Sequence, residues 1–352
     1  MAFDPIQEDC LRLILEDMRR ENVFPLEDAA FIERRMDAYR GDPARLIHTD
    51  RDRSFHLVAR AAEIADYTIP FMTDETELEQ QEDAVEDLLR EAVELDAGNW
   101  DAQRMLAACT APSNEAYVSY LVDNRPAIEQ DVERLAAAAD DPYSREFAAD
   151  LGRRPYLRWL GSLAAQALIS GQYRLSLQAA LDCLSAAPHD PGDVRRTALL
   201  ALAKLEADEE ELEEFQRTHE LAFTTGTAVA ADQDFWMLIA RLSAAYRSYD
   251  MAAAERVLGR LVKSAPHAAQ SLFVQVELPE GLFSRVNVVP GSDDELVLAI
   301  SEATPLLQEG IGGPDAACFA TWICNHELVL SALGPRERAA ARRANGRHGG
   351  GN

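Results

Sequence analysis

The sequence has little that would build a β-sheet, a disulfide framework or a membrane span. Few segments are rich in β-branched residues, and no alternating pattern predicts a series of strands. No apolar run approaches the roughly 18 residues of a membrane-spanning helix. The five cysteines are scattered without a CxxC pair, and the N-terminal MAFDPIQEDC lacks an apolar signal core. These features predict free thiols in a cytoplasmic protein that does not bind a membrane.

Positive charge is also scarce. The chain has 34 lysines and arginines against 61 acids, which gives a formal net charge of −27. The segment from Asp74 to Asp96 contains eleven acidic residues and a single basic residue, Arg90. This balance argues against binding to nucleic-acid phosphates and favours basic or neutral partners.

The usual catalytic and metal-binding motifs are incomplete. The pairs His219-Glu220 and His326-Glu327 begin a zinc-protease HExxH pattern but lack its second histidine. The glycine-rich residues 310–314 lack the Lys-Ser/Thr of a phosphate-binding loop, and no GxSxG is present. We therefore expect no catalytic residues, no cofactor and no metal ligands.

What the sequence does contain is helical periodicity, most clearly between Tyr156 and Asp190. Apolar residues recur there every three or four positions, which predicts two helices. Gly171 separates them, because glycine adopts the left-handed conformation at a helix C-terminus without steric cost. Pro188 ends the second helix. Asp193 is expected to cap a third, Val194 to Lys204.

This stretch resembles a tetratricopeptide repeat, a pair of helices that recurs about every 34 residues. The positions that match the family pattern are Leu163, Ala164, Gly171, Tyr173, Ser176, Ala180, Cys183 and Pro188. Residues 82–104 and 249–266 show similar spacing. The joints at Ala97, Pro188 and Pro266 are not whole multiples of one period apart, so the repeats are degenerate. The resemblance covers roughly a third of the chain. It implies an all-α fold, a right-handed α-solenoid of such hairpins with flanking non-repeat helices.

Four segments are predicted along the chain. Residues 1–70 form an N-terminal helical cap region, 71–266 the degenerate repeat array, 267–335 a mostly helical C-terminal region, and 336–352 a basic, disordered tail. Residues 271–278 have a strand-like composition that also suits a short helix. Other predicted helices lie at 5–20, 27–39, 54–66, 114–121, 126–138, 208–222, 235–247, 293–308 and 315–333.

Arginines are concentrated in two short stretches of this acidic sequence. They are Arg153, Arg154, Arg158, Arg195 and Arg196. The resemblance implies that the first helix of each repeat lines a concave groove, where arginines clamp acidic peptides. A guanidinium group suits this role because it meets a carboxylate with two hydrogen bonds. The predicted peptide-binding residues are therefore Arg154, Arg158, Arg195 and Arg196. The simpler explanation, which we favour, is that these arginines neutralise the chain's own acids.

The functional prediction is a non-catalytic scaffold or adaptor that binds a peptide or helix of a protein partner in a concave solenoid groove. The alternative is an enzyme or regulator whose site lies within 268–335, with the repeats as a recruiting arm. A compact pocket with converging polar groups in that region would favour the alternative.

Overall fold

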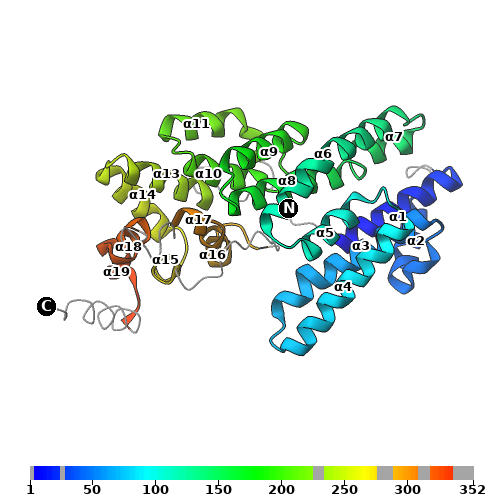
Figure 1. The fold of residues 1–352 in the computed structure, drawn as a ribbon, viewed down its shortest axis with the longest axis horizontal. Helices are drawn as coiled ribbons and strands as arrows, with labels where there is room; N and C mark the ends of the chain where they lie inside the picture. Colours follow the sequence, from blue (N-terminus) through cyan, green and yellow to red (C-terminus); the bar gives the residue numbers. More distant parts are fainter. Residues whose placement is uncertain (1–3, 24–27, 225–233, 276–287, 308–317, 336–352) are drawn as a thin grey trace. The chain divides into compact units, whose positions relative to one another are not determined.

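The computed structural model describes residues 4–23, 28–224, 234–275, 288–307 and 318–335. Every regular element within these ranges is a helix (Figure 1), which confirms the all-α class. None of the described helices is long and apolar enough to cross a membrane. The predicted tail at 336–352 lies outside the described residues.

The chain divides by its internal contacts into two compact units, Ala2–Gln166 and Ala167–Asn352. The division falls inside helix α8 (Arg154–Ile169). The boundaries predicted near residues 70, 266 and 335 follow sequence pattern rather than contacts, and they stay predictions.

The N-terminal unit is built from helices that pack mainly against their sequence neighbours. Its elements are α1 (Pro5–Glu21), α2 (Ala29–Gly41), η1 (Pro43–Arg45), α3 (Asp50–Glu63), η2 (Ile64–Thr68), η3 (Ile69–Phe71), α4 (Glu75–Leu95), α5 (Trp100–Thr110), α6 (Asn114–Ala137), α7 (Pro142–Ala149) and most of α8. Helix α3 packs against α4 and α1, and α1 also contacts α2 and α7 (Figure 1). Val58, Leu89 and Ala92 are completely buried between α3 and α4. Full burial of a leucine contributes roughly 1.5–3 kcal/mol.

Helix α1 begins and ends for local reasons. The Asp4 side chain accepts a hydrogen bond from the Gln7 amide at 2.8 Å, and Pro5 occupies the first turn, where its missing N–H costs nothing. Asn22 adopts the left-handed conformation at the other end, with φ of 51°. The sequence therefore determines the bounds of α1 almost unaided.

Helix α6 corrects one prediction. The sequence suggested two helices, 114–121 and 126–138, separated before Pro126. The structure has one helix of 24 residues with Pro126 inside it. A proline costs roughly 3 kcal/mol in a helix interior. Leu121 and Ile128 lie two turns apart on the same face and are both fully buried, so packing on each side of the proline keeps the helix continuous.

The C-terminal unit contains the end of α8 followed by eleven further helices within the described ranges. They are α9 (Tyr173–Ala186), α10 (Val194–Lys204), α11 (Glu209–Thr218), α12 (Glu220–Thr224), α13 (Phe235–Arg247), α14 (Met251–Lys263), α15 (Ala268–Phe273), α16 (Asp293–Glu302), α17 (Thr304–Leu307), α18 (Cys318–Asn325) and α19 (Glu327–Ala332). Helix α10 packs against α9 and α13, and α13 packs against α14. The strand-like residues 271–273 are helical in α15, while 276–278 lie outside the described residues.

The turns on either side of α9 (Tyr173–Ala186) confirm one local prediction and correct another. Gly171 is left-handed, with φ of 73°, as expected. Asp193 stands at the N-cap of α10 but makes no side-chain cap hydrogen bond. Asp190 does so instead: its carboxylate accepts from the amides of Val194 at 2.7 Å and Arg195 at 3.0 Å. Asp193 is left-handed, with φ of 54°, and its carboxylate binds the Arg195 guanidinium.

Two long helices predicted near the C-terminus are each interrupted. The predicted helix at 315–333 breaks at His326, whose extended backbone and side chain cap α19, with the Leu328 amide donating to Nδ1 at 3.2 Å. The predicted helix at 293–308 ends at Glu302, and Pro305 lies in the separate turn α17. Pro305 has no N–H to donate to the carbonyl four residues earlier, and its ring would clash with that carbonyl, which explains the second break.

Candidate functional site

The structure places each predicted arginine against carboxylates of its own unit. Arg154 and Arg158 belong to the part of α8 in the N-terminal unit, whereas Arg195 and Arg196 begin α10 in the C-terminal unit. The two pairs therefore belong to separate clusters.

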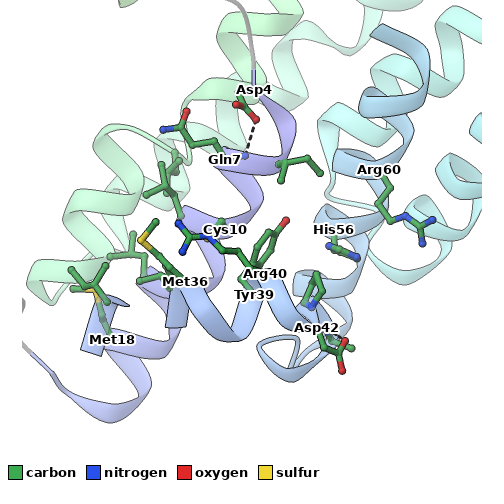
Figure 2. A pocket seen from close by; sticks show the side chains of 18 of the residues that line it. Asp4, Gln7, Cys10, Met18, Met36, Tyr39, Arg40, Asp42, His56 and Arg60 are labelled. Atoms are coloured by element: carbon green, nitrogen blue, oxygen red, sulfur yellow. Dashed lines mark hydrogen bonds between the residues drawn. The ribbon is translucent and has the colours of Figure 1, made fainter. Parts of the chain in front are cut away.

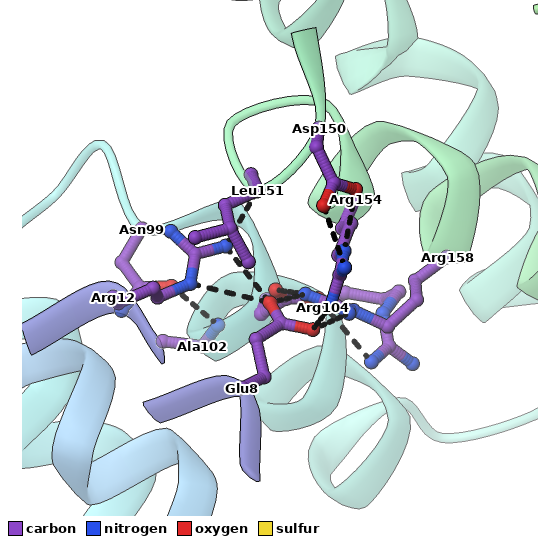
Figure 3. Close-up of polar contacts among 10 residues, drawn as sticks. Glu8, Arg12, Asn99, Ala102, Arg104, Asp150, Leu151, Arg154 and Arg158 are labelled. Atoms are coloured by element: carbon purple, nitrogen blue, oxygen red, sulfur yellow. Dashed lines mark hydrogen bonds and ion pairs between the residues drawn. The ribbon is translucent and has the colours of Figure 1, made fainter. Parts of the chain in front are cut away.

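The first cluster is centred on Glu8 of α1, which is only 2% exposed. Its carboxylate accepts from Arg12 at 2.9 Å, from Arg154 at 3.2 Å and from Arg158 at 3.0 and 3.1 Å (Figure 3). Arg158 also donates from Nε to Asp101 of α5 at 2.8 Å. We call Glu8, Arg12, Asp101, Arg154 and Arg158 the Glu8 network. It ties α1, α5 and α8 together.

Burial and pairing act in opposite directions on the carboxyl groups of this network. Burial alone would raise the pKa of Glu8, but the charges of Arg158 and Arg12 outweigh it and hold that pKa below its ordinary value. Burial opposes ionisation of Asp101 as well, and Arg158 again lowers its pKa. Both carboxyl groups therefore remain ionised at neutral pH.

Aromatic rings support the same network. The Arg12 guanidinium lies 3.8 Å from the centre of the Phe55 ring and donates to the Leu151 carbonyl at 2.7 Å. Trp159, next to Arg158, is fully buried and donates to the Leu121 carbonyl at 2.9 Å. Trp159 therefore packs in the core of the N-terminal unit.

The second cluster surrounds α10. Arg195, 1% exposed, donates to Asp193 at 2.6 Å and to Asp234 at 3.3 Å. Arg196 donates to Glu295 at 2.7 Å and lies 4.0 Å above the Trp236 ring. Both guanidinium groups are enclosed by protein, which stabilises α10 against α13 and α16. A binding role for the four arginines stays a prediction, since ion pairs within the chain do not measure affinity for a peptide.

A further concave surface lies elsewhere, in the N-terminal unit. It is an open groove of about 1140 Å³ lined by residues of α1, α2, η1, α3 and α7 (Figure 2). We call it the α1–α2 groove. Its apolar wall consists of Leu11, Ile14, Leu15, Met18, Ile32 and Met36. Leu11 is 44% exposed and Met36 is 36% exposed, so the groove presents apolar surface to solvent.

A cluster of polar side chains connects the helices that form this groove. The buried Asp9 carboxylate accepts a hydrogen bond from the Tyr39 hydroxyl at 2.7 Å, and the same oxygen lies 2.7 Å from Nδ1 of His56. Burial and the adjacent Asp9 charge raise the pKa of Tyr39, so this phenol stays protonated and continues to donate. Asp9 thus joins α1 to α2 and α3, and fixes two side chains that line the groove (Figure 2).

Sequence reasoning did not identify the α1–α2 groove as a site. The predicted apolar face of residues 5–20 comprised Ile6, Cys10, Leu13, Ile14 and Met18, and it was assigned to a cap. Leu11 and Leu15 extend the apolar surface beyond this face. Apolar surface that a helix does not bury in its own fold marks a contact with a partner. The apolar residues outside the predicted face were therefore the sequence signal for the α1–α2 groove.

The alternative site within 268–335 stays a prediction. The structure describes 268–275, 288–307 and 318–335 of this region, where Gln275 donates to the Leu272 carbonyl at 3.1 Å. Phe319 and Trp322 of α18 lie with ring centres 5.0 and 5.2 Å from that of Tyr246 on α13. These contacts pack α18 against α13.

Comparison of the chain with family models, curated proteins and solved structures returns no match.

Proposed function

We propose that the chain is a non-catalytic protein–protein interaction module that holds a helix or peptide of a partner protein in the α1–α2 groove. The observation that carries this proposal is the exposed apolar wall around Leu11 and Met36. Ligand pockets for small molecules usually occupy about 300–1,000 Å³ and bury most of the ligand. The groove is larger, at about 1140 Å³, and open to solvent, which suits an extended macromolecular segment.

The shape and composition of the groove favour a helical segment. A helix lays an apolar face into such a groove through residues spaced three, four and seven positions apart. Methionine side chains adapt to different partner surfaces because they are unbranched and polarisable. Met36 lines the groove and is 36% exposed, and Figure 2 shows it and Met18, which is only 6% exposed, on neighbouring helices.

We further propose that the helices form a right-handed solenoid with degenerate tetratricopeptide-like repeats. Packing of α10 against α9 and α13, and of α13 against α14, supports this proposal because solenoid helices contact their sequence neighbours. The small residues Ala164 and Ala180, which match the family pattern, are fully buried. The net charge of −27 supports a protein partner rather than a nucleic acid.

Selection from a displayed library of helical peptides tests the binding role. The full chain should enrich peptides with apolar residues at three- and four-residue spacing. The double variant Leu11→Asp/Met36→Asp should lose these peptides, because the charges would be buried against an apolar face. The control is Val122→Asp, which changes an apolar residue of similar exposure, 40%, on α6 and should retain them. Enriched peptides that still bind the double variant would refute the groove as the site.

A further inference from the structure

The charges around the α1–α2 groove indicate the kind of partner it accepts. Five carboxylates line the groove against two guanidinium groups. The acids are Asp4, Asp42, Glu63, Glu146 and Asp150, and the bases are Arg40 and Arg60. An apolar wall is thus bordered by a predominantly acidic rim.

Several of these charges are already engaged. Asp4 caps α1, Asp150 binds Arg154 at 2.8 Å, and Arg40 binds Asp37 at 3.1 Å. Glu63 and Glu146 differ from them. Both are exposed, and no ion pair or side-chain hydrogen bond engages either one among the described residues. They are therefore available to a partner without first losing an internal contact.

The two arginines do not reverse this balance. The charge of Arg40 is offset by Asp37, so the charge of Arg60 faces two carboxylates in the groove lining, those of Glu63 and Glu146. At longer range, the net charge of −27 attracts cationic segments and repels anionic ones. Electrostatic complementarity of this kind selects partners and speeds their encounter.

We infer that the α1–α2 groove binds a basic amphipathic helix of a partner protein, a specificity that rests on the proposed function. The apolar face of the helix packs on Leu11, Ile14, Leu15 and Met36. Lysine or arginine side chains at the edge of that face pair with Glu63 and Glu146. The partner chemistry is therefore opposite to that of an acidic peptide held by an arginine clamp.

Three synthetic helical peptides provide the test, with identical leucines on one face and with lysine, glutamine or glutamate at the flanking positions. Their affinity for the full chain can be measured by fluorescence anisotropy at low and high salt. We expect the order lysine, glutamine, glutamate, from tightest to weakest. The difference should shrink as salt rises, because exposed charges are screened.

The variant Glu63→Gln/Glu146→Gln should weaken the lysine peptide by about threefold to tenfold, since each exposed ion pair contributes little energy. It should leave the glutamine peptide unchanged. The matched control is Glu77→Gln/Glu79→Gln on α4, which removes the same charge from exposed positions outside the groove. A similar loss in the control would indicate unspecific attraction to an acidic chain and would overturn the inference.

The outcomes separate this inference from the proposed function. Three peptides that bind equally, and lose binding in Leu11→Asp/Met36→Asp, would overturn the basic preference and leave the groove as the binding site. If all three peptides bind the Leu11→Asp/Met36→Asp variant as tightly as the wild-type chain, both the basic preference and the proposed binding site are overturned. Residues 336–352 carry five arginines. A marked gain in affinity after their deletion would assign the groove to the chain's own tail, and would overturn the inference of a separate partner.

Discussion

Replacing Arg158 with alanine tests whether the Glu8 network holds the N-terminal unit together. The substitution removes the contacts of Arg158 with Glu8, at 3.0 and 3.1 Å, and with Asp101, at 2.8 Å. Both carboxylates are nearly inaccessible, at 2% and 1% exposure, so they cannot recover these contacts from water. Breaking a buried ion pair in this way typically costs about 3–5 kcal/mol.

The remaining partners place the expected loss near the lower end of that range. Glu8 keeps Arg12 at 2.9 Å and Arg154 at 3.2 Å. Asp101 keeps an ion pair with Arg104, at 3.6 Å. We therefore expect the free energy of unfolding to fall by about 3 kcal/mol. With a urea dependence of about 2 kcal/mol/M, the midpoint of the transition would fall by roughly 1–2 M.

Urea denaturation followed by circular dichroism measures this shift, with Arg45→Ala as the control. Arg45 is also paired, with Asp42 at 3.7 Å, but its side chain is 72% exposed. Loss of such a surface pair should cost no more than about 1 kcal/mol. If Arg158→Ala behaves like Arg45→Ala, the network does not stabilise the fold and our reasoning is wrong.

A binding measurement on the same variant separates the structural role from the predicted clamp. An acidic peptide that binds the wild-type chain should bind Arg158→Ala with unchanged affinity if the arginine only neutralises Glu8 and Asp101. A stable variant with a large loss of affinity would instead support the clamp, in which each charge-assisted contact contributes roughly 1.5–3 kcal/mol.

Three further predictions concern stability. The pKa values of Glu8 and Asp101 lie below their ordinary values, so their contribution to stability is fully present above about pH 5 and is lost as pH falls through the lowered values. Urea titrations in acid should show this loss, with a smaller slope in Arg158→Ala. Gly152→Ala should destabilise the fold, because a Cβ there would lie 2.4 Å from a side-chain carbon of Leu135. Gly161→Ala should stabilise it by about 0.5–1 kcal/mol, because Gly161 lies in the middle of α8 and its Cβ would meet no atom within 4 Å. Thermal melts that rank the two variants in the opposite order would contradict this. Ala180→Trp should strain the buried face of α9 by about 1–3 kcal/mol, and an unchanged melting temperature would mean that Ala180 is not at a close crossing.

The elements that sequence analysis predicted best are those with local causes. Helices α10 and α13 have the predicted bounds, Val194–Lys204 and Phe235–Arg247. Gly171 has the left-handed backbone that its position required. Apolar periodicity and left-handed glycines act over a few residues, so a single sequence contains enough information to place them.

The errors arose where a distant contact outweighs a local preference. Pro126 is a local helix breaker, yet α6 continues through it because Leu121 and Ile128 are buried on the same face. Asp193 has the composition of a helix cap, but Asp190 accepts the backbone hydrogen bonds while Asp193 binds Arg195. In each case tertiary packing selected between two locally acceptable arrangements.

The sequence by itself determined the all-α class, most helix positions and the acidic surface. Only the tertiary structure decided the partners of the arginines and the position of the α1–α2 groove. Glu8 and Arg158 are 150 residues apart, and their contact depends on how α1 packs beside α8 in the N-terminal unit. The groove likewise requires α1, α2, α3 and α7 to leave apolar surface uncovered. Periodicity determines which face of a helix is apolar, whereas burial and ion pairing depend on which distant helices come to cover that face.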